Sequence, residues 1–165
     1  MPTSKEAVSS LVPGILAAGL IVGAMDAVAA NAHAYLLRGT PPGAVWRYVA
    51  SAVFGKSAGN GGPEMIVWGL LFHLMVATGW TALFFLAYPK LRFLPANMVV
   101  AGMAYGLFVW LMMNFVVVPL TRITIGPIRP TTGTLLMILI HLFVIGVPIS
   151  YLAHRHYGKR GALRC

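Results

Sequence analysis

Residues 135–147 read LLMILIHLFVIGV, and this stretch decides the fold class. Every residue in it except His141 is apolar or glycine. An α-helix rises about 1.5 Å per residue, so about 20 apolar residues are needed to cross the roughly 30 Å hydrocarbon layer of a membrane. The apolar run extends beyond the quoted stretch, from Thr134 to Ala153. It therefore predicts a transmembrane helix that carries an imidazole inside its apolar length.

The composition of the whole chain indicates the same fold class. Of its 165 residues 59% are hydrophobic and only 9% are charged, whereas soluble domains have about 25% charged residues. Backbone polar groups must be paired inside lipid, and a helix pairs its own. We therefore predict an all-α membrane protein with a single four-helix transmembrane domain over residues 1–165. The predicted spans are Leu11–Leu37, Met65–Tyr88, Met98–Leu120 and Thr134–Ala153.

A short amphipathic helix is predicted over Ala44–Phe54, in the first connecting segment. Pro41 and Pro42 before it and Gly55 after it are typical start and stop signals. We expect this helix to lie in the outer membrane interface, where aromatic and basic side chains act as anchors. A lid packed over the end of the bundle is the alternative. The candidate lipid-contacting residues are Trp46, Arg47, Arg122 and Arg129.

The distribution of Lys and Arg predicts the orientation. With both termini cytoplasmic, that side holds seven of these residues and the other side five, as the positive-inside rule favours. The seven are Lys5, Lys90, Arg92, Arg155, Lys159, Arg160 and Arg164. We interpret the net charge of +9 as contact with anionic headgroups, not with nucleic acid. The expected partner is the lipid bilayer, and a homo-oligomer or a larger membrane complex stays open.

Two patterns occur twice in the chain. Ala18-Gly19-x3-Gly23-x7-Asn31 recurs as Ala101-Gly102-x3-Gly106-x7-Asn114, and His-Leu-x-Val begins at both His73 and His141. The sequence therefore predicts two similar helix hairpins. Because both hairpins run in the same direction, they form a 2+2 parallel repeat with its axis along the membrane normal.

The repeat predicts a layer of polar side chains in the outer half of the bundle. His73 and His141 both fall about 11–12 Å below the outer ends of their predicted helices. Small residues recur at four-residue spacing on the first three predicted helices, which is typical of helix–helix contacts and directs the polar residues inward. The candidate binding residues are His73, His141, Asn31, Asn114 and Asp26.

Several roles fit such a layer. Its hydrogen bonds can serve packing alone, at about 0.6–2 kcal/mol each. Paired axial ligation of a haem b iron by His73 and His141 is a second role, and a soft metal such as copper, held by histidine with methionine, is a third. A fourth is a proton or small-solute site in which Asp26 titrates and a histidine relays. A lipid or partner-subunit site is the last.

Catalysis is not indicated. The sequence has no H-E-x-x-H, G-x-S-x-G or phosphate-binding glycine motif, so we nominate no catalytic residue and assign no cofactor. Our working hypothesis is a binding or transport-related site open to the outer face. A structural or accessory subunit of a membrane complex is the competing class.

The stretch from Trp68 to Tyr151 resembles the YagU-like group of uncharacterised bacterial inner-membrane proteins and their four-helix relatives. The resemblance implies a bacterial cytoplasmic (inner) membrane and no established biochemical activity, and it supplies no catalytic residue. The matching pieces are Trp68-x4-His73, Pro89-Lys90, Ala101-Gly102, Met113-Asn114, Val118-Pro119-Leu120 and His141 followed by Gly146-Val147-Pro148.

Overall fold

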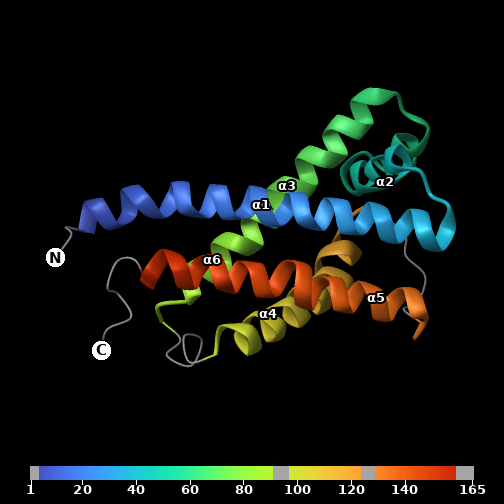
Figure 1. The fold of residues 1–165 in the computed structure, drawn as a ribbon. Coiled ribbons are helices and arrows are strands. Elements are labelled where there is room, and N and C mark those ends of the chain that lie inside the picture. The colour runs from blue at the N-terminus through green and yellow to red at the C-terminus, as the bar shows by residue number, and fades with distance from the viewer. Residues whose placement is uncertain (1–3, 91–96, 124–128, 159–165) are drawn as a thin grey trace.

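The computed structural model describes residues 4–90, 97–123 and 129–158, with side chains described from Leu11 onward. These residues form helices joined by short connections (Figure 1). Four helical segments are long and apolar enough to cross a membrane, as the sequence predicts. They are Leu11–Arg38, Pro63–Ala87, Met98–Leu120 and Thr132–Gly158.

The four spans are built from labelled elements with small differences from the predicted bounds. The first span lies in α1, the second is α3, the third joins α4 to η2 and η3, and the fourth joins α5, η4 and α6. The fourth is longer than predicted because the polar run HRHY after Ala153 continues the helix. The bounds are α1 Ser4–Arg38, α3 Pro63–Ala87, α4 Met98–Met112, η2 Met113–Val117, η3 Val118–Leu120, α5 Thr132–Ile140, η4 His141–Gly146 and α6 Val147–Gly158.

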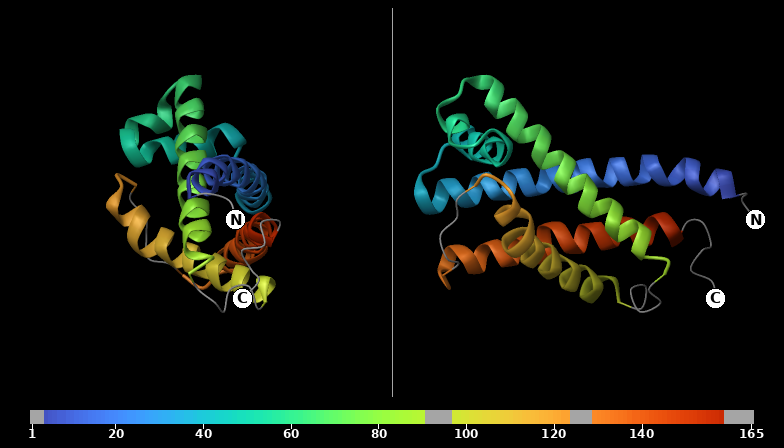
Figure 2. Two further views of the ribbon diagram at one scale, coloured as in Figure 1. Left: turned by 90° about the vertical axis from the view of Figure 1, so that its left-hand side faces the viewer. Right: turned by 180° about the vertical axis from the view of Figure 1, so that it is seen from behind.

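The spans pack as a crossed bundle. α1 runs along the line formed by α5, η4 and α6, while α3 crosses α1 obliquely and α4 packs on η4 and α6 (Figure 1, Figure 2). The start of α1 and the end of α6 lie at one end of the bundle, and α2 lies at the other. Of the charges that predict the orientation, Arg92, Lys159, Arg160 and Arg164 and the side chain of Lys5 lie outside the described residues.

The predicted amphipathic helix is present as α2, Pro42–Phe54, and it packs against α3. It begins two residues earlier than predicted because proline is well tolerated in the first turn of a helix, where its missing N–H is not needed. Gly69 of α3 has no side chain, and a Cβ there would overlap the backbone carbonyl of Trp46. A short 3-10 turn, η1 (Lys56–Asn60), follows α2. α2 is therefore packed on the bundle, and its position relative to a membrane stays a prediction.

Glycines allow the other close helix contacts. A Cβ on Gly19 would lie 2.7 Å from Oγ1 of Thr78, where α1 meets α3. A Cβ on Gly106 or Gly146 would overlap backbone atoms where α4 meets η4. The small residues that recur at four-residue spacing thus lie at helix–helix contacts, as the sequence predicts.

Two spans are interrupted by π-helical turns. Met113–Val117 and His141–Gly146 each end two residues before a proline, Pro119 and Pro148. A proline has no N–H for the carbonyl four residues earlier, and its ring clashes with that carbonyl. In both spans this carbonyl lies inside the π-helical turn, which widens the helix locally. The prolines therefore account for the position of both interruptions.

The aromatic core lies at the end of the bundle opposite α2. Tyr88 is fully buried there, and its hydroxyl shares a 2.8 Å hydrogen bond with Nδ1 of His154. Its ring stacks on Tyr157 with 5.7 Å between the centroids. The hydrogen bond and the stack join α6 to the residue that follows α3.

Replacing Tyr88 by phenylalanine is expected to lower the free energy of unfolding by about 1 kcal/mol, because His154 loses a buried hydrogen bond. Reversible unfolding in mixed micelles measures this difference. Tyr151→Phe is the control, since Tyr151 is exposed and its hydroxyl should contribute nothing. Equal stability of the Tyr88→Phe protein and the parent would show that this hydrogen bond is energetically neutral.

Candidate functional site

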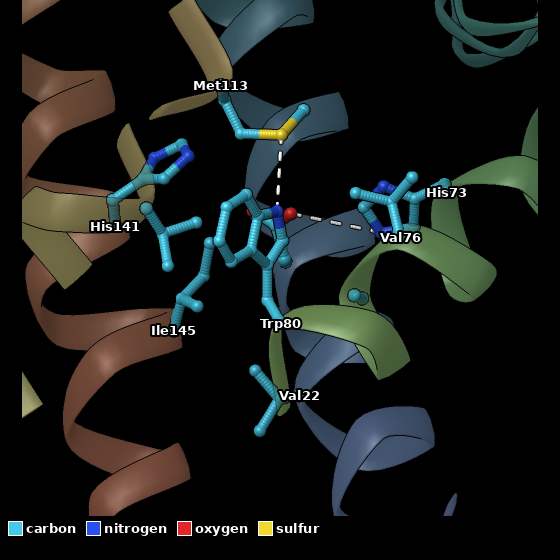
Figure 3. Close-up of a pocket in the computed structure, with 10 residues that line it drawn as sticks. Val22, His73, Val76, Trp80, Met113, His141 and Ile145 are labelled. Carbon is cyan, nitrogen blue, oxygen red and sulfur yellow. Dashed lines mark hydrogen bonds and ion pairs between the residues drawn. The ribbon is translucent and has the colours of Figure 1, made fainter. Parts of the chain in front are cut away.

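A partly open cavity of about 70 Å³ lies between the helices, and all four spans contribute to it (Figure 3). One water molecule needs roughly 10–15 Å³ of such space, so the cavity has room for a few waters or one very small solute. Its lining is largely apolar, with a few polar side chains. The lining residues are Val22, Asp26, His73, Val76, Ala77, Trp80, Val109, Met113, His141 and Ile145.

The depth of the cavity follows from helix lengths. His141 is nine residues after the start of α5, and His73 is ten after the start of α3, which corresponds to about 14 and 15 Å. Both are deeper than the predicted 11–12 Å because each span begins two residues earlier than predicted. The cavity therefore lies nearer the middle of the bundle than the sequence suggested.

Asp26 enters the cavity from α1, one turn after Val22. Its Oδ2 lies 3.8 Å from Nε2 of His73, which is longer than a hydrogen bond. Its Oδ1 has no hydrogen-bond partner among the described residues, although the side chain is only 17% exposed. This oxygen is thus enclosed by the bundle without a donor from the described part of the chain.

His73 is fixed by two contacts outside the cavity. Nε2 donates a 2.9 Å hydrogen bond to the carbonyl oxygen of Gly23. A carbonyl only accepts, so Nε2 carries the hydrogen and Nδ1 holds a lone pair in the neutral ring. Trp46 of α2 packs on the imidazole edge to face, with 5.4 Å between the centroids. α1 and α2 together therefore set the orientation of this histidine.

His141 is the first residue of the π-helical turn η4, and it is 8% exposed. Nδ1 donates a 2.8 Å hydrogen bond to the carbonyl oxygen of Met137, one turn earlier. By the same reasoning Nε2 holds the lone pair in the neutral ring. The two histidines thus present different ring nitrogens as acceptors.

Trp80 and Met113 bridge two spans across the cavity. The indole N–H of Trp80 donates to the sulfur of Met113 over 3.3 Å, which joins α3 to η2 (Figure 3). Sequence reasoning missed Trp80, but its position carried a signal. It follows His73 by seven residues, which is two helical turns, so the two side chains share a face.

The structure brings Asp26, His73 and His141 to the cavity and leaves Asn31 and Asn114 outside it. The side-chain NH₂ groups of Asn31 and Asn114 donate to the carbonyl four residues earlier in their own helix, Ala27 and Trp110. Successive residues of an α-helix are rotated by about 100°. Asn31 follows Asp26 by five residues, so its side chain is rotated by about 140° from that of Asp26 around the axis of α1.

The candidate lipid-contacting residues lie near α2 or near the start of α5. Nε of Arg47 donates to the carbonyl of Gly61 over 2.8 Å, and Trp46 contacts His73. The backbone N–H of Arg122 donates to Ala52 of α2 over 3.1 Å, and its side chain is exposed. Arg129 is also exposed. Contact of these residues with lipid stays a prediction.

The cavity is too small for haem b, one of the two cofactors that the sequence left open, while copper held by histidine with methionine stays a prediction. Pockets for cofactors and drug-sized ligands occupy about 300–1,000 Å³, so the porphyrin of haem b is too large for a cavity of about 70 Å³. In the described part of the chain, no three His, Cys, Asp or Glu side chains are placed to hold one metal ion. The geometry instead suits a ligand of very few atoms.

Comparison with known proteins assigns neither a family nor a function to this chain. No family model, no curated protein and no solved structure matches this chain. The resemblance to the YagU-like group stays a prediction from the motifs of the sequence, and the function has to be inferred from the cavity.

Proposed function

We propose that this multi-pass membrane protein binds a proton or a very small polar solute in its central cavity and passes it across the membrane. Asp26 carries the proposal, because its Oδ1 lies inside the bundle without a partner among the described residues. A buried polar atom without a partner costs about 1–3 kcal/mol. An ionisable residue inside a transmembrane segment is by default a candidate functional group.

The surroundings of Asp26 support a role in transfer. His73 lies 3.8 Å away through Nε2, and His141 lines the same cavity. Imidazole groups commonly relay protons in proteins. Asp26 would accept the proton or solute, and the two imidazoles would stabilise it and pass it on.

The π-helical turns support a cavity that can change shape. Met113 belongs to η2, while His141 and Ile145 belong to η4, and all three line the cavity. Such turns are frequent at functional sites. Converting either turn to a regular helix would rotate its lining residues, and this is the movement we propose for admitting and releasing the solute.

The repeat belongs to the same proposal. Gly23 and Gly106 are equivalent in the predicted repeat. The carbonyl of Gly23 bonds the imidazole of His73, and Gly106 lies against the backbone of His141. This correspondence supports a 2+2 duplication.

The orientation and the membrane belong to the same proposal. The start of α1 and the end of α6 lie at the same end of the bundle (Figure 1), which supports termini on one side of the membrane, and we assign this side to the cytoplasm of a bacterial cell. A relationship to the YagU-like group would place the chain in the inner membrane.

Proton entry into vesicles tests the proposed function. The parent protein, reconstituted with a trapped pH dye, should acidify the lumen when a potassium gradient with valinomycin drives protons inward. Asp26→Asn should reduce entry to the rate of protein-free vesicles, because its amide cannot exchange a proton. Ser150→Ala is the matched control, since Ser150 is fully buried in the fourth span and does not line the cavity.

Infrared spectroscopy of the Asp26 carboxyl group gives a second measurement. The chain has only three Asp and Glu residues, so the infrared bands of Asp26 can be identified by their loss in Asp26→Asn. We expect a protonated-carboxyl band from Asp26 that titrates with pH. Entry rates that Asp26→Asn leaves unchanged, together with a band that does not titrate, would contradict the function and favour a structural subunit.

A further inference from the structure

The N–H donors of the cavity side chains are already bonded to protein acceptors. Nε2 of His73 donates to Gly23, Nδ1 of His141 donates to Met137, and Nε1 of Trp80 donates to the sulfur of Met113. The remaining lining residues, apart from Asp26, have apolar side chains. With neutral imidazoles and an ionised carboxylate, the described lining thus offers a ligand no free side-chain donor.

Acceptors, in contrast, are present on the lining residues. Asp26 contributes a carboxylate to the lining, and no described residue donates a hydrogen bond to its Oδ1. In the neutral rings, Nδ1 of His73 and Nε2 of His141 hold lone pairs, because the other nitrogen of each ring carries the hydrogen. No Lys or Arg is among the lining residues. With an ionised carboxylate, the lining residues therefore supply one negative charge and lone pairs but no free side-chain donor.

We infer that, beside the proton, the cavity selects a small monovalent cation that donates hydrogen bonds, of the ammonium or methylammonium class. This inference rests on the proposed function, because it names the solute of the same cavity. An N–H cation can donate to Asp26 and to an imidazole nitrogen while it balances the buried charge. An anion would meet a carboxylate and no donor. A metal cation such as sodium also binds lone pairs, but hard cations take several oxygen ligands, and Asp26 has the only side-chain oxygens among the described lining residues.

The size of the cavity narrows the class further. About 70 Å³ accommodates a few water-sized groups. Ammonium and methylammonium have one or two heavy atoms and fit this space. Tetramethylammonium has the same charge but has no N–H and is larger, so it is the matched negative probe. Sodium is a small cation without N–H, so it tests whether positive charge alone is enough for binding. Formate is a small anion, so it tests whether the sign of the charge matters.

Thermal unfolding of the purified protein in detergent tests the inference. A ligand that binds only the folded state raises the unfolding midpoint with its concentration. Ammonium chloride and methylammonium chloride should raise the midpoint by a few degrees over equal concentrations of tetramethylammonium chloride or sodium chloride. Sodium formate should have no effect beyond that of sodium chloride. Asp26→Asn should lose the shift, whereas Ser150→Ala should keep it.

Each outcome decides between the two proposals. If sodium or tetramethylammonium raised the unfolding midpoint as much as ammonium does, the cavity would not select cations that donate hydrogen bonds, and the inference would be wrong. A rise of the midpoint with formate would also contradict it. Absence of any shift, with proton entry still dependent on Asp26, would overturn the inference and leave the proposed function intact. The series on the parent protein is decisive by itself, even if Asp26→Asn does not fold. The infrared carboxylate band of Asp26 should also shift with ammonium and not with sodium.

Discussion

Gly146→Ala is expected to lower the free energy of unfolding by at least about 2 kcal/mol, although it adds only one methyl group. The added Cβ would overlap the carbonyl oxygen of Gly102 and would lie 2.8 Å from the backbone nitrogen of Gly106. Both neighbours are backbone atoms of α4, so no side-chain rotation can relieve the overlap. Overpacking of a core by one group typically costs about 1–3 kcal/mol, and it costs more where the backbone must move.

Gly79→Ala is the matched control for this prediction. Gly79 is also in a transmembrane helix, but a Cβ there would meet nothing within 4 Å. Alanine is favoured over glycine inside a helix by roughly 1 kcal/mol, so this variant should be neutral or slightly more stable. Unfolding of both variants in mixed micelles gives the comparison. Equal stability of Gly146→Ala and Gly79→Ala would mean that α4 and η4 are not in close contact.

A double variant tests whether the cost belongs to one helix contact. A Cβ on Gly102 would lie 2.7 Å from the carbonyl oxygen of Gly146, so both glycines serve the same approach of α4 to η4. Once the first methyl has separated the helices, the second should add little. We expect Gly102→Ala with Gly146→Ala to cost clearly less than the sum of the single variants. Because η4 carries His141 and Ile145, these variants should also disturb the cavity.

The spans were predictable from the sequence because their signal is length and apolarity, which the bilayer imposes on every crossing. The ends of the spans were less predictable. The fourth span continues to Gly158, since polar residues such as His154 and Arg155 stay helical after the apolar run has ended. The contact of α2 with α3 depends on Gly69 meeting the backbone of Trp46. A single sequence does not show which surface an isolated glycine faces.

The site was predictable in part for a similar reason. Polar residues in apolar runs are conspicuous, so Asp26, His73 and His141 were nominated, and the structure places all three at one cavity. Depth along the span grouped them correctly, but rotation about the helix axis decides which side chains share a space. Asn31 and Asn114 were grouped by depth but do not line the cavity, and each donates to a carbonyl of its own helix. The π-helical turn at His141 also changes the rotation locally, and Pro148 was the signal for it.

Asp26→Leu is expected to increase the free energy of unfolding by about 1–3 kcal/mol while it abolishes proton entry. Asp26 has a buried oxygen without a partner among the described residues, and removing such a group recovers about that much. Leucine has the same number of side-chain heavy atoms and the same branching, and its larger methyl groups would extend into the cavity beside Val22 and other apolar residues of the lining. Replacing buried ionic groups by well-packed apolar residues is often stabilising. A more stable but inactive protein is the result expected when a residue serves function at the expense of stability.

The opposite result would assign Asp26 to packing. A residue that only holds helices together loses stability when its polar group is removed, so a less stable Asp26→Leu protein with unchanged proton entry would contradict the functional role. Ser150→Ala separates the two effects, because the buried Oγ of Ser150 also has no partner among the described residues but lies outside the cavity. It should be slightly stabilising and leave proton entry unchanged. Only the residue at the cavity should couple a gain in stability to a loss of transport.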